Sequence, residues 1–339
     1  MEYFRPIAMC DAARPRGALA LAGGWCWFDR IEVLSRNRPP RLIAASTAPE
    51  VVRDVLSLPR PAFAGLAMNR PRLMGILNVT PDSFSDGGQY LDPRSALTRG
   101  TGVAAVSDIV DIGGESTRPG AVEVPVAEEI SRTIPVIEAL RHQGLRNAIS
   151  IDTRKALVAA AALRAGADLV NDVSGLEFDP MLGPLIGQTG VPVVLMHAQG
   201  LPATMQNDPR YGDVLLDVYD ALSQRIQAAV ALGIDRAKIA IDPGIGFGKT
   251  AAHNLALIRG LSLFHGLGCP ILLGASRKRF IGAIGGADRA EDRAPGSVAV
   301  ALAGIAQGVQ ITRVHDAAET RQALRLWQAV HGRTEEAQA

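Results

Sequence analysis

The sequence predicts an α/β protein in which eight parallel strands close into a (β/α)8 TIM barrel, preceded by an N-terminal extension of irregular or mixed structure. Between residues 72 and 315, short apolar runs end in polar residues eight times, on average about 34 residues apart, which suits one strand followed by one helix. Helical patterns lie between the runs. A doubly wound open sheet is the alternative, but that fold needs no eighth strand at Val309 to His315.

Length and composition agree with a large packed core. The chain has 339 residues, enough for such a barrel and one additional segment. Hydrophobic residues make up 47% of the chain and charged residues 20%, which is typical of a folded protein. The formal net charge is +1 and no block of lysine or arginine stands out, so a nucleic-acid partner is not expected.

Cysteine usage and the lack of a targeting pattern predict a cytoplasmic protein with no membrane partner. Cys10, Cys26 and Cys269 are odd in number and scattered, and they show neither a disulfide framework nor metal-ligand spacing. The apolar stretch 17–28 is far too short to span a bilayer, and no cleavage site precedes Asp29. These patterns indicate a reducing compartment.

Residues 1–70 differ from the rest of the chain. Prolines break this segment into short pieces, with one helix predicted around Glu50 to Leu58, and no catalytic constellation is visible. We expect a structural extension packed on the outside or bottom of the barrel, and a partner-docking role stays open. The barrel is expected over residues 71–331, followed by a polar tail over 332–339.

Two helices of the barrel can be placed from their patterns. Between Tyr211 and Leu232, apolar residues recur every three or four positions, which predicts an amphipathic helix with one stripe facing the barrel. The last helix is expected to have Asp316 as its N-cap, with Glu319 at the spacing of a capping box.

Polar residues follow the apolar runs at the expected carboxyl ends of the strands, where a TIM barrel builds its active site. A single aspartate at such a place is more often a helix cap than a catalytic group, but capping does not explain polar residues at every strand end. We expect these side chains to converge on one cavity: Asn78, Asp111, Asp152, Asn171, Asp172, Met196, His197, Asp242, Ser276, Arg277, Lys278, Arg313 and His315.

One part of this set offers acceptors for a heterocycle. Asp152, Asn171 and Asp242 should line a buried cup. Buried carboxylates need partners, and the N–H edge of a pterin or a guanine would supply them. Met196 and Phe247 could cover the faces of such a ring.

The other part is cationic and glycine-rich, which predicts a phosphate site. Phosphate oxygens bind arginine forks and exposed backbone N–H groups. A heterocycle with phosphates suggests a diphosphate leaving group, which generally travels with Mg²⁺; this ion favours oxygen ligands, and Asn78 could provide one. The cationic part comprises Arg118, Lys278, Arg313 and His315, with Gly244, Gly246 and Gly248.

The motifs around these residues occur in a specific order: MGILNVTPDSFSDGG (74–88), DIGGESTRPG (111–120), SIDT (150–153), NDVSG (171–175), LMH (195–197), DPGIGFGK (242–249), GASRK (274–278) and RVHD (313–316). Over residues 72 to 331 the chain therefore resembles the dihydropteroate synthase family. The resemblance implies a transferase of folate biosynthesis. Such an enzyme condenses 6-hydroxymethyl-7,8-dihydropterin diphosphate with p-aminobenzoate and releases 7,8-dihydropteroate and pyrophosphate.

The resemblance also implies roles for single residues. Asp152, Lys278, Thr117 and Arg118 would be catalytic, and Asp111, Met196 and Ser276 would contact substrate. The pterin would be held by Asp152, Asn171, Asp242 and Lys278, and the diphosphate by Asn78, Thr117, Arg313 and His315, with Mg²⁺ beside Asn78. The p-aminobenzoate would lie near Phe84, Thr117, Arg118, Pro119, Phe247 and Lys278. Family analogy favours a homodimer.

The expected mechanism is electrostatic rather than covalent. An aniline nitrogen is already neutral at pH 7, so no strong general base is required. Mg²⁺ and the cationic groups would assist departure of the diphosphate, and a buried carboxylate would stabilise the developing pterin cation.

The chain departs from the family pattern at three places. The lead-in of about 70 residues is longer than usual, Arg279 stands where some members carry a serine near the p-aminobenzoate carboxylate, and Val106-Ser107 replace a commoner Gly-Ala pair. Three other functions compete: a pterin-binding methyltransferase domain, a non-catalytic pterin-binding paralogue, and an unrelated phosphate-binding barrel. The methyltransferase would need a cobalamin partner module, and the intact loop motifs argue against the other two.

Overall fold

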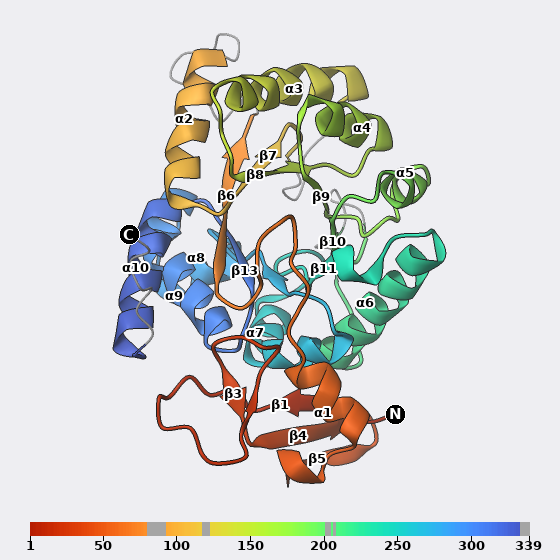
Figure 1. Cartoon of the computed structure of the whole chain (residues 1–339), viewed down its shortest axis with the longest axis vertical. Helices are drawn as coiled ribbons and strands as arrows, with labels where there is room; N and C mark the ends of the chain where they lie inside the picture. The colour runs from red at the N-terminus through yellow and green to blue at the C-terminus, as the bar shows by residue number, and fades with distance from the viewer. Residues whose placement is uncertain (80–92, 117–122, 201–204, 206–207, 333–339) are drawn as a thin grey trace.

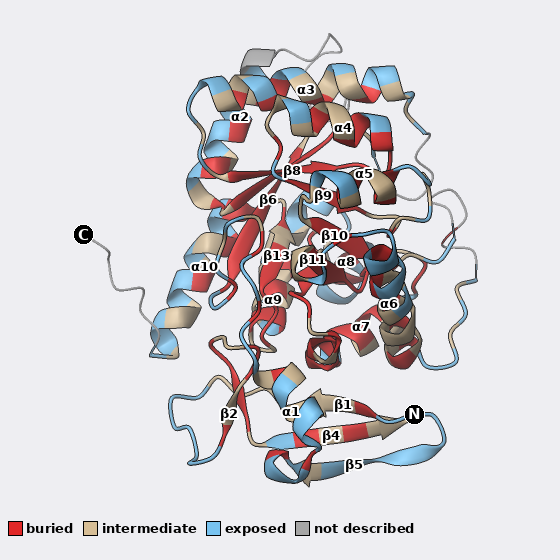
Figure 2. Ribbon diagram, turned by 45° about the vertical axis from the view of Figure 1, so that its right-hand side comes forward, coloured by how far each residue is buried: buried red, intermediate tan, exposed pale blue. Residues whose placement is uncertain are grey.

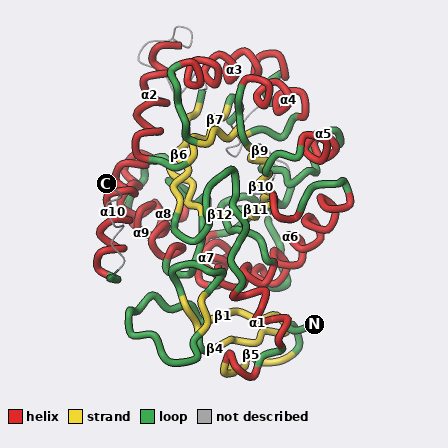
Figure 3. Tube along the Cα trace, viewed as in Figure 1, coloured by secondary structure: helices red, strands yellow, loops and turns green. Residues whose placement is uncertain are grey.

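The computed structural model describes residues 1–79, 93–116, 123–200, 205 and 208–332. Eight parallel strands form one sheet in the order β11-β10-β9-β8-β7-β6-β13-β12. A parallel bridge between Ile241 and Ile271 joins the two ends of this sheet and closes the barrel. Figure 3 shows the strands as a ring inside a shell of helices. The strands are β6 (Arg72–Asn78), β7 (Ile109–Gly113), β8 (Ala148–Asp152), β9 (Leu169–Asp172), β10 (Val193–Met196), β11 (Ile239–Asp242), β12 (Leu272–Leu273) and β13 (Ile311–Val314).

The predicted TIM barrel is therefore confirmed. Each apolar run of the sequence overlaps one of these eight strands. Helices cover the outside of the ring, and their exposed residues point away from it (Figure 2). In the part of the chain that the structure describes, no helix has the length and apolar character needed to span a membrane. The outer helices are α2 (Pro93–Val106), α3 (Val126–His142), α4 (Ala156–Ala165), α5 (Leu182–Thr189), α6 (Val214–Ala231), α7 (Ala251–Arg259), α8 (Arg279–Gly285), α9 (Ala294–Ile305) and α10 (Ala317–Val330).

The helix predicted over Tyr211 to Leu232 is α6, which begins at Val214 rather than Tyr211. Asp213 sets this start, because its carboxylate accepts hydrogen bonds from the backbone N–H groups of Leu215 and Leu216. The buried residues of α6 recur at helical spacing along one stripe, as the sequence predicted.

The capping box predicted for the last helix is wrong. Asp316 does occupy the N-cap position of α10, but its side chain makes no capping hydrogen bond. The carboxylate is taken instead by the guanidinium of Arg277, whose Nε donates to Asp316 Oδ2 at 3.0 Å. A charged partner from the neighbouring strand end offers a stronger hydrogen bond than a backbone N–H does.

The N-terminal extension is more regular than the sequence suggested. β1 (Tyr3–Pro6), β4 (Arg30–Ser35) and β5 (Arg38–Ala44) form an antiparallel sheet in the order β1-β4-β5, and β2 (Leu19–Ala20) pairs with β3 (Trp27–Phe28). The predicted helix is confirmed as α1 (Glu50–Ser57). In Figure 1 the extension forms the lower end of the molecule, against the helical shell of the barrel.

The extension is joined to the barrel by apolar packing and by polar contacts. Its cluster of Leu21, Trp25 and Phe28 includes Leu73, Ile305 and Leu324 of the barrel. Polar contacts join the extension to α6 and to the end of α9. Trp25 Nε1 donates to Ile305 O at 2.8 Å, Tyr3 Oη donates to Asp220 at 2.8 Å, and Arg36 pairs with Asp217 and Asp220 at 2.6 and 2.7 Å.

The segment between α1 and β6 closes the floor of the barrel. Phe63 and Met68 are fully buried there, and Figure 1 shows this segment crossing the middle of the ring before it enters β6. Phe63 and Met68 belong to one apolar cluster that includes one residue from each of the eight strands: Met74, Ile109, Ala148, Leu169, Val194, Ala240, Leu272 and Ile311. The extension therefore supplies part of the barrel's own core.

We expect Phe63→Ala to lower the free energy of unfolding by about 3–5 kcal/mol, because it leaves a cavity under all eight strands. Urea unfolding followed by circular dichroism would measure this loss. Leu58→Ala in the same segment is the matched control, since Leu58 is 58% exposed. Equal, small losses in both variants would contradict the assignment of Phe63 to the barrel core.

Candidate active site

Four buried polar side chains, here called the acidic cup, cluster toward the carboxyl ends of β7, β8, β9 and β11. Asp111, Asp152, Asn171 and Asp242 are all at most 7% exposed. The parallel register places Asp152 beside Gly113 on one side and beside Asn171 on the other. The side-chain amide of Asn171 donates to Asp111 at 3.3 Å. The sequence analysis expected Asp152, Asn171 and Asp242 to line one cup, and the structure places them at the ends of β8, β9 and β11.

Arg313 reaches the cup from β13. Its Nε donates to Asp111 Oδ2 at 2.5 Å and its Nη2 donates to Asp152 Oδ2 at 2.6 Å. The second oxygen of Asp152, Oδ1, is buried and has no hydrogen-bond partner among the residues that the structure describes. A buried acceptor of this kind is costly unless a ligand satisfies it.

Burial favours the protonated form of two carboxyl groups in the cup by raising their pKa. It raises the pKa of Asp152, against the opposing charge of Arg313, and the nearby carboxylate of Asp111 raises it further. Burial likewise raises the pKa of Asp242 to about 6, although the Gly244 N–H and the charges of Lys278 and Lys249 oppose the shift. Each group would therefore favour a ligand that donates hydrogen bonds to its ionised form.

We expect Asp242→Asn to stabilise the fold at about pH 7.5 by roughly 1–3 kcal/mol and to change stability little at about pH 4.5. The folded wild type binds this proton more tightly than the unfolded chain does. The stability that protonated Asp242 contributes below pH 3.8 is therefore lost as the pH rises through about 6. The asparagine carries no charge at either pH.

Denaturant unfolding at the two pH values measures this difference. Asp213→Asn is the control, because this exposed N-cap of α6 can be replaced by another capping residue. A stabilisation that is equal at both pH values would contradict the buried-carboxylate explanation.

The loop after β11 brings an aromatic ring and a cation together. Gly244 has φ +69°, and a Cβ there would lie 1.8 Å from the carbonyl oxygen of His197, so only glycine fits this turn. The Nζ of Lys278 lies 3.9 Å from the centre of the Phe247 ring, a distance typical of a cation–π contact. The same Cβ at Gly244 would lie 3.3 Å from the Cγ of Met196, a buried residue that ends β10.

The buried side chain of Lys249 contacts this loop. The sequence analysis did not include Lys249 among the site residues. Its buried Nζ lies 2.9 Å from His197 Nδ1 and 3.0 Å from the carbonyl oxygen of Phe247. Burial lowers the pKa of Lys249 to about 7, and burial together with the charge of Lys249 lowers the pKa of His197 to about 2. His197 is therefore a neutral acceptor for the lysine, and both residues position Phe247. The only sequence signal was a lysine at the end of a glycine-rich loop.

The turn after β12 carries Ser276, Arg277 and Lys278, and it lies beside His315. Ser276 Oγ lies 3.1 Å from His315 Nδ1 and accepts the backbone N–H of His315 at 3.2 Å. Arg277 has φ +58°, an unusual value for a non-glycine residue. Its backbone is fixed by Ser297 Oγ, which accepts the Arg277 N–H at 2.8 Å. The fixed backbone of Arg277 therefore sets the positions of its two neighbours in the chain, Ser276 and Lys278.

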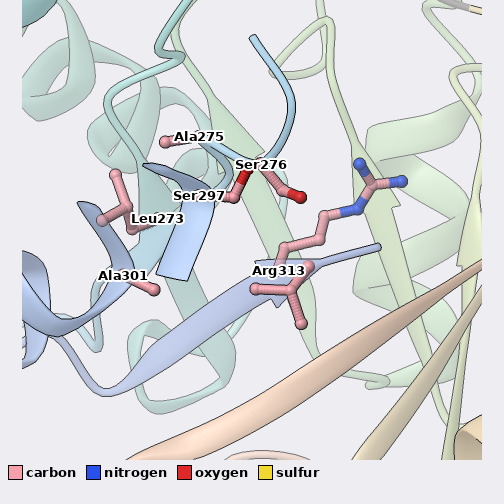
Figure 4. A pocket seen from close by; sticks show the side chains of 7 residues that line it. Leu273, Ala275, Ser276, Ser297, Ala301 and Arg313 are labelled. Atoms are coloured by element: carbon pink, nitrogen blue, oxygen red, sulfur yellow. The ribbon is translucent and has the colours of Figure 1, made fainter. Parts of the chain in front are cut away.

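Figure 4 shows a small pocket beside this turn, between the ends of β12 and β13 and helix α9. Arg313 lines it, and its guanidinium extends away from the other lining side chains (Figure 4); this guanidinium donates to Asp111 and Asp152. The pocket contains none of the cup's carboxyl groups, so it is a packing space behind the site rather than the site itself. Its lining residues are Leu273, Ala275, Ser276, Ser297, Ala301, Arg313 and Val314.

Asn78 and Asp152 lie on either side of Gly113. A Cβ on Gly113 would be 3.4 Å from the Cβ of Asp152 and 3.8 Å from Asn78 Oδ1, so the two side chains share one region. Among the described residues, no group of three or more His, Cys, Asp or Glu side chains could hold a metal ion. Four predicted site residues, Phe84, Thr117, Arg118 and Pro119, lie outside the described residues.

A second cluster that sequence reasoning missed surrounds Glu115. Lys155 Nζ donates to Glu115 Oε2 at 2.6 Å and to the buried Glu129 Oε2 at 2.8 Å. Arg154 donates to the other oxygen of Glu115 at 2.9 Å. Two cationic side chains therefore hold Glu115, which belongs to the DIGGESTRPG motif. No local sequence pattern predicts this pairing, because Glu115 and Lys155 are far apart in sequence.

Fold and site together define a pterin-binding enzyme of the TIM-barrel class, and the family model described as "Pterin binding enzyme" matches residues 74–315. Within that class, the chain belongs to the dihydropteroate synthase family. It is 47% identical over 248 residues to the dihydropteroate synthase of Synechocystis sp., covering 73% of this chain and 86% of the relative. It is 43% identical over 265 residues to the Escherichia coli enzyme, covering 78% and 93%.

Solved structures agree with this assignment. The Xanthomonas albilineans dihydropteroate synthase with 4-aminobenzoic acid superimposes with a TM-score of 0.75 and 47% identity, over 80% of this chain and 98% of that one. The same enzyme in complex with 7,8-dihydropteroate gives a TM-score of 0.72 and 45% identity, over 80% and 98%.

Proposed function

We propose that this chain is a dihydropteroate synthase that condenses 6-hydroxymethyl-7,8-dihydropterin diphosphate with p-aminobenzoate in folate biosynthesis. The observation that carries the proposal is the buried cup of Asp111, Asp152, Asn171 and Asp242 beside cationic groups on β13 and after β12. A pterin has the N–H edge that such a cup requires, and its diphosphate would extend toward the cations. Relatives solved with 4-aminobenzoic acid and with 7,8-dihydropteroate support the choice of substrates.

In the proposed reaction the aniline nitrogen attacks the methylene carbon that bears the diphosphate. The carbon–nitrogen bond forms, the carbon–oxygen bond to the diphosphate breaks, and the aniline nitrogen loses a proton. Asp152 Oδ1, buried without a partner in the described part of the chain, would accept an N–H of the pterin. Ionised Asp152 would then stabilise positive charge on the ring as the diphosphate leaves.

Asn171 and Asp242 would complete the pterin contacts from the neighbouring strands. Lys278, over the ring of Phe247, would bind both the pterin and the p-aminobenzoate, with Met196 covering a ring face. Arg313 and His315 would bind the diphosphate, and Asp111 and Ser276 would hold those two cations in position. The roles of Phe84, Thr117, Arg118 and Pro119 rest on the family resemblance alone.

We also propose that Mg²⁺ accompanies the diphosphate, with Asn78 as a protein ligand. The donor set fits this ion, since Mg²⁺ prefers oxygen ligands and usually keeps several waters and substrate phosphates in its coordination shell. A single amide oxygen beside the cup is enough for such a site. The ion would neutralise charge on the departing diphosphate.

The remaining parts of the proposal concern organisation. We propose a cytoplasmic homodimer whose chains consist of a structural extension (1–70), a pterin-binding barrel (71–331) and a polar tail (332–339). The packing of Phe63 and Met68 in the barrel floor supports a structural role for the extension. Light scattering after size-exclusion chromatography would test the dimer.

The decisive experiment is pyrophosphate release by purified protein given pterin diphosphate and Mg²⁺, with and without p-aminobenzoate. Release that depends on p-aminobenzoate and yields dihydropteroate is expected. Tight pterin binding without turnover would instead indicate a non-catalytic pterin-binding protein, and no binding at all would contradict both functions.

A further inference from the structure

The fold brings together two cysteines that the sequence shows as scattered. The sulfur atoms of Cys10 and Cys26 lie 3.2 Å apart. Cys26 is buried at 2% exposure, whereas Cys10 is partly exposed. Both belong to the N-terminal extension, and the proposed synthase function does not use them.

The backbone holds this pair in the geometry of a cross-strand disulfide. Met9 and Trp27 form an antiparallel bridge in which each N–H donates to the other's carbonyl, at 2.8 and 2.9 Å. Cys10 and Cys26 are the next opposing pair, at a non-hydrogen-bonded position, where Cα atoms are typically about 4.5 Å apart. Disulfides commonly join Cα atoms separated by about 4.4–6.8 Å. The 3.2 Å between the two sulfurs and this register place the pair within reach of a disulfide bond.

We propose that Cys10 and Cys26 form a reversible disulfide by exchange with a small-molecule disulfide such as glutathione disulfide. The Cys10 thiolate attacks one sulfur of the oxidant and forms a mixed disulfide, releasing one glutathione thiolate. Cys26 then loses its proton and attacks the Cys10 sulfur, which releases the second glutathione. Two protein thiols are oxidised, one small disulfide is reduced to two thiols, and the two protons pass to the leaving thiolates.

The different exposure of the two residues assigns their order of reaction. An oxidant can reach Cys10 but not the buried Cys26, which lies within 3.2 Å of the sulfur it must attack. A mixed disulfide on Cys10 is therefore resolved within the protein. The third cysteine, Cys269, is buried at 1% exposure and provides an internal reference.

The pair lies against the end of α9. Cys10 Sγ is 3.3 Å from the carbonyl oxygen of Ala306, and Cys26 Sγ is 3.6 Å from that of Ile305. Oxidation removes these weak S–H donors, but Trp25 Nε1 still donates to Ile305 O. The disulfide also closes the loop between residues 10 and 26, which restricts the unfolded chain. We expect the loop closure to dominate and to raise Tm by about 4 °C.

The test is to incubate the reduced protein with glutathione disulfide, then denature, alkylate and map the peptides. We expect one alkylated thiol, Cys269, and a peptide in which Cys10 is linked to Cys26 within one chain. Dithiothreitol should restore all three thiols. Trp25 and Trp27 flank Cys26 and are buried, so quenching of tryptophan fluorescence should accompany the oxidation of the folded protein.

Three variants sharpen the result. Cys10→Ser should retain Cys26 as an unmodified thiol, Cys26→Ser should accumulate a glutathione adduct on Cys10, and Cys269→Ser should oxidise like the wild type. Circular dichroism before oxidation verifies that each variant is folded, and the partly exposed Cys10 position carries the test if the buried one is not tolerated. A persistent glutathione adduct on wild-type Cys10, a disulfide between two chains, or alkylation of all three thiols would overturn the proposal.

Discussion

Asp152→Asn is expected to lower kcat by about a hundredfold to a thousandfold while leaving the fold intact, an effect similar to that of removing one preorganised electrostatic group. The substitution keeps the size of the side chain and one acceptor oxygen, but it removes the charge that stabilises the pterin cation. It also weakens the contact with Arg313, which donates to Asp152 Oδ2 at 2.6 Å. Pyrophosphate release under substrate saturation measures kcat, and thermal unfolding verifies the fold.

Asp172→Asn is the matched control for this experiment. Asp172 is equally buried at the end of the next strand, but its oxygens accept hydrogen bonds from the backbone N–H groups of Ser174 and Leu176 at 2.8 and 2.6 Å. We expect this variant to keep kcat, because the carboxylate of Asp172 is occupied by these local hydrogen bonds. Turnover of Asp152→Asn close to that of the wild type would remove Asp152 from the mechanism.

Deletion of residues 1–70 is expected to abolish soluble, monodisperse protein. The deletion would expose Leu73, Ile305 and Leu324 on the outside of the barrel, and it would remove Phe63 and Met68 from its floor. Apolar surface of this extent, newly open to water, favours aggregation. Size-exclusion chromatography and soluble yield would measure the effect.

A point variant separates this prediction from a loss of surface contacts. Arg36→Gln removes only the partly exposed ion pairs with Asp217 and Asp220, and such pairs typically contribute about 0–1 kcal/mol. This variant should stay soluble and active. A truncated barrel that is soluble and melts at the wild-type temperature would show that the extension is dispensable for folding.

The barrel and the acidic cup could be predicted because their signals are local. Strands buried on both faces appear in the sequence as continuous apolar runs, and the residue after each run lies at the rim of the barrel. Asp152, Asn171 and Asp242 could therefore be assigned to one cavity without knowing the helices between them.

Other features depend on contacts that no local pattern encodes. Arg313 meets Asp111 across 202 residues, and this pair forms because β13 and β7 both pair with β6. Asp316 has the spacing of a capping residue, but the competing partner Arg277 comes from another strand end. The role of Phe63 depends on where an irregular segment crosses the barrel, which propensity and periodicity do not specify.

The attachment of the extension constrains the order in which the molecule can form during synthesis. Trp25 donates to the carbonyl of Ile305, 280 residues later, and Leu324 belongs to the same apolar cluster. Trp25 therefore leaves the ribosome long before the partners that it packs against are made. Contacts at such separation form late, because the entropy of closing a long loop opposes them. The N-terminal sheet is therefore synthesised well before the barrel residues that fix it in place.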